Sequence, residues 1–152
     1  MAKSKWREQY DRMKQWRARL DESVQSDERR RDDFYAFFVC CYHLVDWVEN
    51  DDSLTDVVRA GVRQFVKDSD ALGLAADVTN GFKHLKRKQT PQFDATAHVS
   101  VIGDFTLDAS QLDVSRLAGF VIAGGQTWED AYALADRCIK EWEGFLRRHG
   151  LM

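Results

Sequence analysis

The stretch DFYAFFVCCYHLVDWVEN, residues 33–50, decides the fold of this chain. Its apolar residues fall on nearly every side of a helix, and a helix that is hydrophobic all round is usually buried at the centre of a domain. The main face consists of Phe34, Phe37, Phe38, Cys41, Leu44, Val45 and Val48, with Tyr35, Val39 and Trp47 on other sides. We therefore expect a central helix that begins at Asp32 or Asp33 and ends at Asn50.

The residues before this stretch predict an amphipathic helix over 4–25. Its apolar residues recur at spacings of three, four and seven, which places them on one face. They are Trp6, Tyr10, Met13, Leu20 and Val24. Arg17 interrupts this narrow stripe, so we expect the helix to lie against the domain or against a partner rather than in the core. The densely charged run 26–33 indicates a turn or a frayed helical end.

Two further helices are expected after the central one. Residues 53–67 predict a helix capped by Ser53, with Asp56 at the capping-box position. Its inward residues are expected to be Leu54, Val57, Val58, Val62 and Phe65. A fourth helix is expected from residue 69 or 70 to about 87, and Thr90-Pro91 ends it. Its buried residues are expected to be Leu74, Val78, Gly81, Phe82 and Leu85.

The period then changes from helical to alternating. Residues 97–101 and 105–107 predict two strands joined by a turn at Gly103-Asp104, with 117–123 as a possible third strand. Thr127 with Asp130 repeats the capping-box pattern and opens a last helix, for which Gly150 is the stop. The inner residues of that helix are expected to be Tyr132, Ala135, Ile139, Trp142, Phe145 and Leu146.

The predicted fold class is therefore mainly α, a bundle of about five helices with a small antiparallel hairpin or three-stranded insert before the last helix. A chain of 152 residues has the length of one ordinary domain. Within that single domain we expect a basic N-terminal helix and charged turn (1–30), central helices (33–88), a β insert (95–123) and a C-terminal helix (127–149).

The charge of the chain is unevenly distributed. The formal net charge is −3, yet residues 1–20 carry seven Lys or Arg against Glu8 and Asp11. Such an arm suits nucleic acid or an acidic partner surface, but a solvated helix face has the same composition. No apolar run is long enough to span a bilayer or to form a signal peptide, so we expect no membrane contact and a cytoplasmic location. Three cysteines favour reduced thiols over a disulfide framework.

The first polar stripe lies on the central helix. His43 and Asp46 are three residues apart and share a face with Trp47, opposite the main apolar face. That face is either a second packing surface containing a polar site or a subunit contact. A pair that merely satisfies its own hydrogen bonds gives the same pattern.

The second polar stripe lies on the fourth helix. Asp77, Asn80 and His84 occupy positions zero, three and seven, with Lys83 further round towards solvent or a ligand. A structural role for this set and a ligand site remain equally open. Neither stripe has the Glu-x-x-His or His-x3-His spacing of metal sites, and there is no phosphate loop or nucleophile elbow. We therefore expect no metal and no cofactor.

Three segments together resemble small bacterial and phage proteins of the HEPN (higher eukaryotes and prokaryotes nucleotide-binding) superfamily. They are FFxxCYHLxDW at 37–47, DxxNGxKHL at 77–85 and WxxFL at 142–146, and the resemblance covers about residues 33–147. It implies a helical bundle, frequent dimerisation, and work in phage-defence, toxin–antitoxin or RNA-processing systems. Many members are metal-independent ribonucleases that use an Arg followed a turn or two later by a His.

This chain departs from that Arg–His pattern, because Asp77, Val78 and Thr79 stand at the relevant distances before His84. The expected function is therefore a non-catalytic HEPN-like component that dimerises or binds a protein partner, a nucleotide or RNA. The alternative is a metal-independent ribonuclease or nucleotide-modifying enzyme. Its catalytic candidates are His84, Asn80 and Lys83, with His43 or Asp46 assisting.

Overall fold

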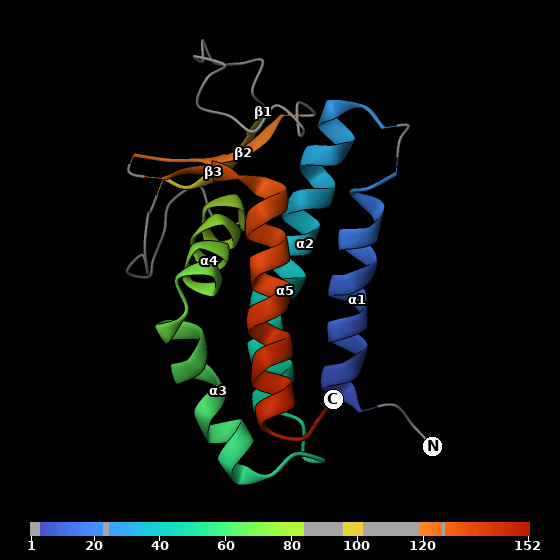
Figure 1. Cartoon of the computed structure of the whole chain (residues 1–152), viewed down its shortest axis with the longest axis vertical. Coiled ribbons are helices and arrows are strands. Elements are labelled where there is room, and N and C mark those ends of the chain that lie inside the picture. The colour runs from blue at the N-terminus through green and yellow to red at the C-terminus, as the bar shows by residue number, and fades with distance from the viewer. Residues whose placement is uncertain (1–3, 23–24, 84–95, 102–118, 126) are drawn as a thin grey trace.

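A computed structural model describes residues 4–22, 25–83, 96–101, 119–125 and 127–152. The elements, in chain order, are α1 (Lys5–Arg19), α2 (Asp27–Glu49), α3 (Asp56–Asp68), α4 (Asp70–Lys83), β1 (His98–Val101), β2 (Phe120–Ala123), β3 (Trp128–Asp130) and α5 (Ala131–Arg148). Five helices and a three-stranded antiparallel sheet before the last helix confirm the predicted fold class. Figure 1 shows the sheet across the end of the bundle where α5 begins, with α1 on one side of α5 and α3 and α4 on the other.

The helix α2 is the central element, as its sequence predicts. It packs against α1, α3, α4, α5 and β1, and its three phenylalanines, Phe34, Phe37 and Phe38, are fully buried. The indole of Trp142 in α5 donates a hydrogen bond to the backbone oxygen of Cys41 at 3.1 Å, deep between the two helices. Burial of large apolar side chains on several faces of one helix makes α2 the axis around which the other elements pack.

The start of α2 differs from the prediction. The charged run 26–33 is helical from Asp27 onward, and is neither a turn nor a frayed end. Ser26 is the N-cap, and its side chain accepts a hydrogen bond from the backbone nitrogen of Arg29 at 3.2 Å. Asp27 and Glu28 then lie in the first turn, where negative charge is favourable for the helix dipole.

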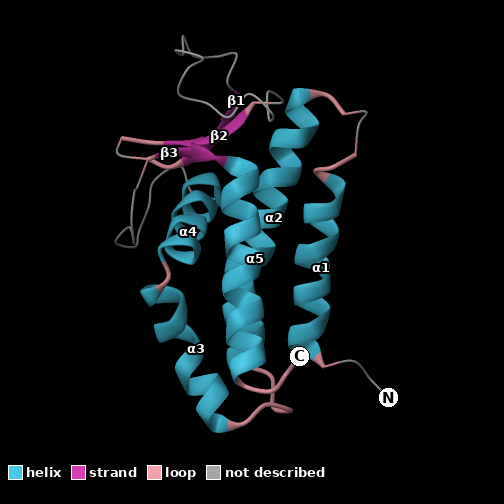
Figure 2. Cartoon of the chain, viewed as in Figure 1, coloured by secondary structure: helices cyan, strands magenta, loops and turns pink. Residues whose placement is uncertain are grey.

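The helix α1 lies against α2 at one side of the bundle (Figure 2), as expected of a helix laid against the domain. Its apolar stripe nevertheless belongs to the core, which corrects the expectation drawn from the narrowness of that stripe. Trp6, Met13 and Leu20 are buried, and α1 packs along α2. The Gln9 side chain, also buried, donates to the backbone oxygen of Cys40 at 3.0 Å. Because α2 has apolar groups on several sides, a helix with a narrow stripe is enough to cover one of them.

Two helix caps also lie elsewhere than predicted. The N-cap of α3 is Thr55, whose hydroxyl accepts from the backbone nitrogen of Val58 at 3.4 Å, whereas Ser53 binds the carboxylate of Asp51. This start places Val57 on the outside, 73% exposed, and not inward as expected.

The N-cap of α5 is Asp130, which accepts from the backbone nitrogen of Ala133 at 2.9 Å. Thr127 does not open the helix, because residues 128–130 form β3 first. The predicted stop is confirmed: Gly150 has a φ of 67°, a left-handed conformation that favours glycine. All six predicted inner residues of α5 are buried.

The sheet has the order β1-β2-β3, with β2 buried along its whole length. Val99 pairs with Ile122, and Ile122 pairs with Glu129 on the other side. The hydroxyl of Tyr35 on α2 accepts a hydrogen bond from the backbone nitrogen of Val99 at 3.1 Å, which ties the edge strand to the central helix. The predicted strand at 105–107, its turn and the end of the fourth helix at 90–91 lie outside the described residues.

Candidate functional site

His43 and Asp46, the first polar stripe, are in direct contact and join α2 to α3. Nδ1 of His43 lies 3.0 Å from Oδ2 of Asp46. The other carboxylate oxygen of Asp46 accepts from Nη2 of Arg63, on α3, at 2.9 Å. Arg63 also donates through Nε to Glu49 at 2.7 Å, and its Nη2 forms a second hydrogen bond to the same carboxylate. We call His43, Asp46, Arg63 and Glu49 the α2–α3 network.

The α2–α3 network is partly exposed and carries more negative than positive charge. The side chains of His43 and Asp46 are 32% and 42% exposed. Hydrogen bonding to Glu49, and then to Asp46, raises the pKa of Arg63 above its ordinary value, so its guanidinium stays charged. One guanidinium facing two carboxylates leaves a net charge of about −1 while the imidazole is neutral. This arrangement repels phosphate rather than attracting it.

The face of α2 that holds Trp47 was expected to meet a second packing surface or a subunit. The structure places α1 over part of it: Cys40 is buried beneath α1, and the guanidinium of Arg12 lies 5.5 Å from the ring centroid of Trp47. Burial raises the pKa of the Cys40 thiol, an effect that the charge of Arg12 partly offsets. A helix of the same chain therefore covers part of this face, as expected for a second packing surface.

The second polar stripe is divided by burial. Asp77 is fully buried, Asn80 is partly exposed, and α4 ends at Lys83. His84 lies outside the described residues. Thr79, which the sequence did not single out, is also fully buried, and within the described part of the chain its hydroxyl has no hydrogen-bond partner.

Phe82 corrects the expected inner face of α4. It was predicted to be buried but is 57% exposed, and it stacks on the ring of Tyr35 with centroids 4.4 Å apart. Gly81 is also exposed, and a Cβ added there would lie 3.5 Å from the backbone oxygen of Ala97. The last turn of α4 is therefore exposed rather than part of the core, and it lies beside the start of β1.

The end of α4 and the His43–Asp46 pair lie at different levels of α2. Phe82 marks the end of α4 at the level of Tyr35, whereas His43 and Asp46 are eight and eleven residues further along α2. At 1.5 Å per residue this separation is roughly 12 to 17 Å along the helix axis. The sequence could not show this, because the packing of α4 on α2 sets which levels meet.

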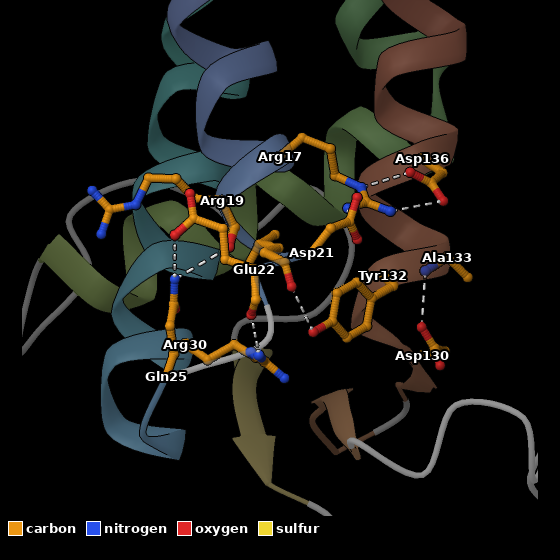
Figure 3. A network of polar contacts seen from close by, with 11 residues as sticks. Arg17, Arg19, Asp21, Glu22, Gln25, Arg30, Asp130, Tyr132, Ala133 and Asp136 are labelled. Carbon is orange, nitrogen blue, oxygen red and sulfur yellow. Dashed lines mark hydrogen bonds and ion pairs between the residues drawn. The ribbon is translucent and has the colours of Figure 1, made fainter.

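The basic side chains of α1 are largely used in contacts within the chain. Arg17 donates to Asp136 on α5 at 2.7 Å and to Asp21 at 2.9 Å, and Lys14 pairs with Glu143 at 3.5 Å. Figure 3 shows Arg17 between these two aspartates, next to Tyr132, whose hydroxyl donates to the backbone oxygen of Leu20.

Two more of these side chains have partners at the ends of α1. Arg19 pairs with Asp33 at 3.3 Å, and Arg7 donates to the backbone oxygen of Leu151 at 2.8 Å. Arg12 donates to the side chain of Gln9, one turn earlier on α1. Five of the seven basic residues among the first twenty therefore make a contact within the chain. This use of the charge favours the interpretation of α1 as an element of the bundle over a nucleic-acid arm.

His98 and His149 lie away from both stripes. Nδ1 of His98 lies 2.9 Å from the backbone oxygen of Thr96, and His149 packs on the ring of Phe145 with centroids 4.6 Å apart. All three cysteines carry free, buried thiols, and burial raises the pKa of Cys138 well above its usual range. Across the described residues, no three His, Cys, Asp or Glu side chains come together as a metal-binding group.

No helix in the described ranges is long and apolar enough to cross a membrane. No protein family model, curated protein or solved structure matches the chain.

The sequence did not indicate two residues of the α2–α3 network, Arg63 and Glu49. They enter the site from α3 and from the last turn of α2, and a separation of 17 residues between Asp46 and Arg63 carries no periodic pattern that could have revealed the contact.

Proposed function

We propose that this protein is a non-catalytic binding component, HEPN-like in the organisation of its helices, which acts by holding a partner protein. The partner is a second protein or a second copy of the chain, and the setting is a cytoplasmic defence or toxin–antitoxin system of a prokaryote. The observation that carries the proposal is the pairing of Arg63 with both Glu49 and Asp46 beside His43.

That pairing matters because ribonuclease chemistry at a histidine needs a cation to stabilise the charged transition state. Arg63 donates a hydrogen bond to Asp46 of the His43–Asp46 pair, but the carboxylate of Glu49 binds the same guanidinium. A phosphate entering here meets Asp46 and Glu49 as well. Lys14, Arg17 and Arg19 of α1 likewise pair with carboxylates of the chain, which weakens the case for a nucleotide or RNA ligand there.

The experiment is to purify the full chain and to combine light scattering with affinity capture from host extract. A defined dimer, or one partner protein retained at fixed stoichiometry, supports the proposal. A strict monomer that retains no protein overturns it. The same preparation, incubated with RNA and nucleotides, is expected to leave them intact.

A second function, a metal-independent ribonuclease or nucleotide-modifying enzyme, is favoured by one observation. Asp46 holds the imidazole of His43 through Nδ1, as an orienting carboxylate does beside a general base. The test compares wild type with His43→Ala and His84→Ala, with and without chelator. Turnover that is lost in either variant would replace the binding proposal with an enzyme, and the variant that loses it would show which stripe acts.

A further inference from the structure

Two rows of side chains meet on one side of the α1–α2 packing. Arg12, Trp16 and Arg19 occupy positions zero, four and seven of α1 and share one helix face. On α2, Trp47 lies opposite Arg12, and His43 is four residues before Trp47, on the same side of the helix. We call the surface formed by these five residues the α1–α2 seam. It remains partly exposed although α1 covers the helix face beneath it.

An arginine guanidinium lies over the indole ring of each tryptophan in the seam. The guanidinium carbon of Arg12 lies 5.5 Å from the ring centroid of Trp47, and that of Arg19 lies 4.8 Å from the ring centroid of Trp16. Contact with an indole face holds an arginine in place, so less entropy is lost when the arginine binds a partner. Trp and Arg are also the residue types that contribute most to the affinity of protein interfaces.

Arg12 differs from the other arginines of this region in its partners. It donates to the side-chain oxygen of Gln9 at 2.5 Å, and among the described residues no carboxylate lies within ion-pair distance of it. Arg19, by contrast, pairs with Asp33, and Arg63 binds Asp46 and Glu49. The seam therefore presents one positive charge that no described carboxylate compensates.

We propose that the α1–α2 seam is a docking surface for an acidic segment of a partner protein. A carboxylate of that segment accepts two parallel hydrogen bonds from Arg12, and an adjacent apolar or aromatic side chain packs on the indole of Trp47. A guanidinium suits a carboxylate because its planar fork matches the two oxygens. This inference rests on the proposed function, since it names where the partner is held and what chemistry holds it.

The charges around the seam favour an acidic protein segment over a nucleic-acid strand. A strand brings a negative charge with every nucleotide and needs a row of cations to bind it. The seam has one uncompensated cation, and Asp46, 42% exposed, stands beside His43 and Trp47. A segment with a single carboxylate flanked by apolar groups needs only one such cation.

The test selects random dodecapeptides displayed on phage against the immobilised full-length protein, with parallel selections on Arg12→Gln and on Lys140→Gln. Lys140 is an exposed lysine on α5, so its variant removes the same charge at another place. Synthetic peptides from the selection are then titrated by tryptophan fluorescence, alongside single-stranded oligouridine of equal length. Circular dichroism confirms that each variant is folded.

We expect enriched peptides that carry Asp or Glu next to an aromatic or large apolar residue. Arg12→Gln should weaken their binding by about tenfold or more, and Lys140→Gln by less than about twofold. Replacing the peptide carboxylate by its amide should cost wild type a similar factor and cost Arg12→Gln little. Absence of acidic peptides, equal binding by Arg12→Gln, or tighter binding of oligouridine than of any peptide would each overturn the inference.

Failure of this inference and failure of the proposed function give different results. If the partner captured from host extract binds wild type and Arg12→Gln equally, the protein is still a binding component but the seam is not where it binds. If wild type captures no partner and is a strict monomer, the proposed function itself fails.

Discussion

Arg17, on α1, donates two hydrogen bonds to the carboxylate of Asp136, on α5, with Nε to Oδ1 at 2.7 Å and Nη2 to Oδ2 at 3.4 Å. The Arg17 side chain is mostly buried, so this contact is stronger than an ordinary surface pair. We expect Arg17→Ala to lower the free energy of unfolding by about 1 to 3 kcal/mol, measured by urea denaturation. Arg147, which is 66% exposed and lies 3.6 Å from Glu143, is the matched control.

Arg147→Ala is expected to change stability by less than about 1 kcal/mol. A double-mutant cycle with Asp136→Asn should return a clear coupling energy for Arg17 and none for Arg147. Equal losses from the two arginine variants would show that the α1–α5 contact is no stronger than a solvent-exposed pair.

Leu44 and Val57 test the inner faces of α2 and α3, the first as predicted and the second as corrected by the structure. Leu44 is fully buried in α2, whereas Val57, predicted to point inward, is 73% exposed. Leu44→Ala should cost about 2 to 5 kcal/mol because it leaves a cavity. Val57→Ala should stay within about 0.5 kcal/mol, since little contact is lost and alanine has the higher helix propensity. If Val57→Ala lowers the free energy of unfolding by more than about 2 kcal/mol, Val57 is buried and its assignment to the surface is wrong.

Tyr10 predicts how stability changes at high pH. Burial, together with its hydrogen bond to Glu143, raises the pKa of Tyr10 from 10.0 to about 12. Because the folded state favours the protonated phenol, Tyr10 contributes its full stabilisation below about pH 10. This contribution is lost as the pH rises from about 10 towards 12. Denaturation of wild type and Tyr10→Phe at several pH values should show a steeper decline in wild type. Parallel curves would contradict this assignment.

Arg63 is expected to matter little for stability, because its partners are on the surface. Arg63→Ala should cost less than about 1 kcal/mol, although Arg63 contacts two carboxylates. If the α2–α3 network instead contributes several kcal/mol, its residues are needed for folding, and loss of function in their variants would not report on binding. The free energy of unfolding of Arg63→Ala should therefore be measured by urea denaturation before the variant is used in binding experiments. Glu49→Gln, which changes the partner of Arg63, should be measured beside it.

Much of the fold could be predicted because apolar periodicity is a local property. The all-round hydrophobicity of residues 33–50 indicated the central helix, and the change to alternation after residue 96 indicated the sheet. Helix starts were less predictable. Ser53 and Thr127 have the composition of caps, yet Thr55 and Asp130 hold those positions, since a cap requires a backbone nitrogen three residues on with no other partner.

The candidate site was predictable only where its residues share a helix. The contact of His43 with Asp46 follows from a spacing of three residues, and the structure shows it at 3.0 Å. The packing of the helices against one another decided the other contacts. It brings Arg63 to Asp46, pairs arginines of α1 with Asp33 and Asp136, and places the guanidinium of Arg12 over the ring of Trp47. Sequence alone determines which face of each helix is apolar. Tertiary packing decides which polar side chains meet, because charges distant in the chain come together only when the apolar faces between them are buried.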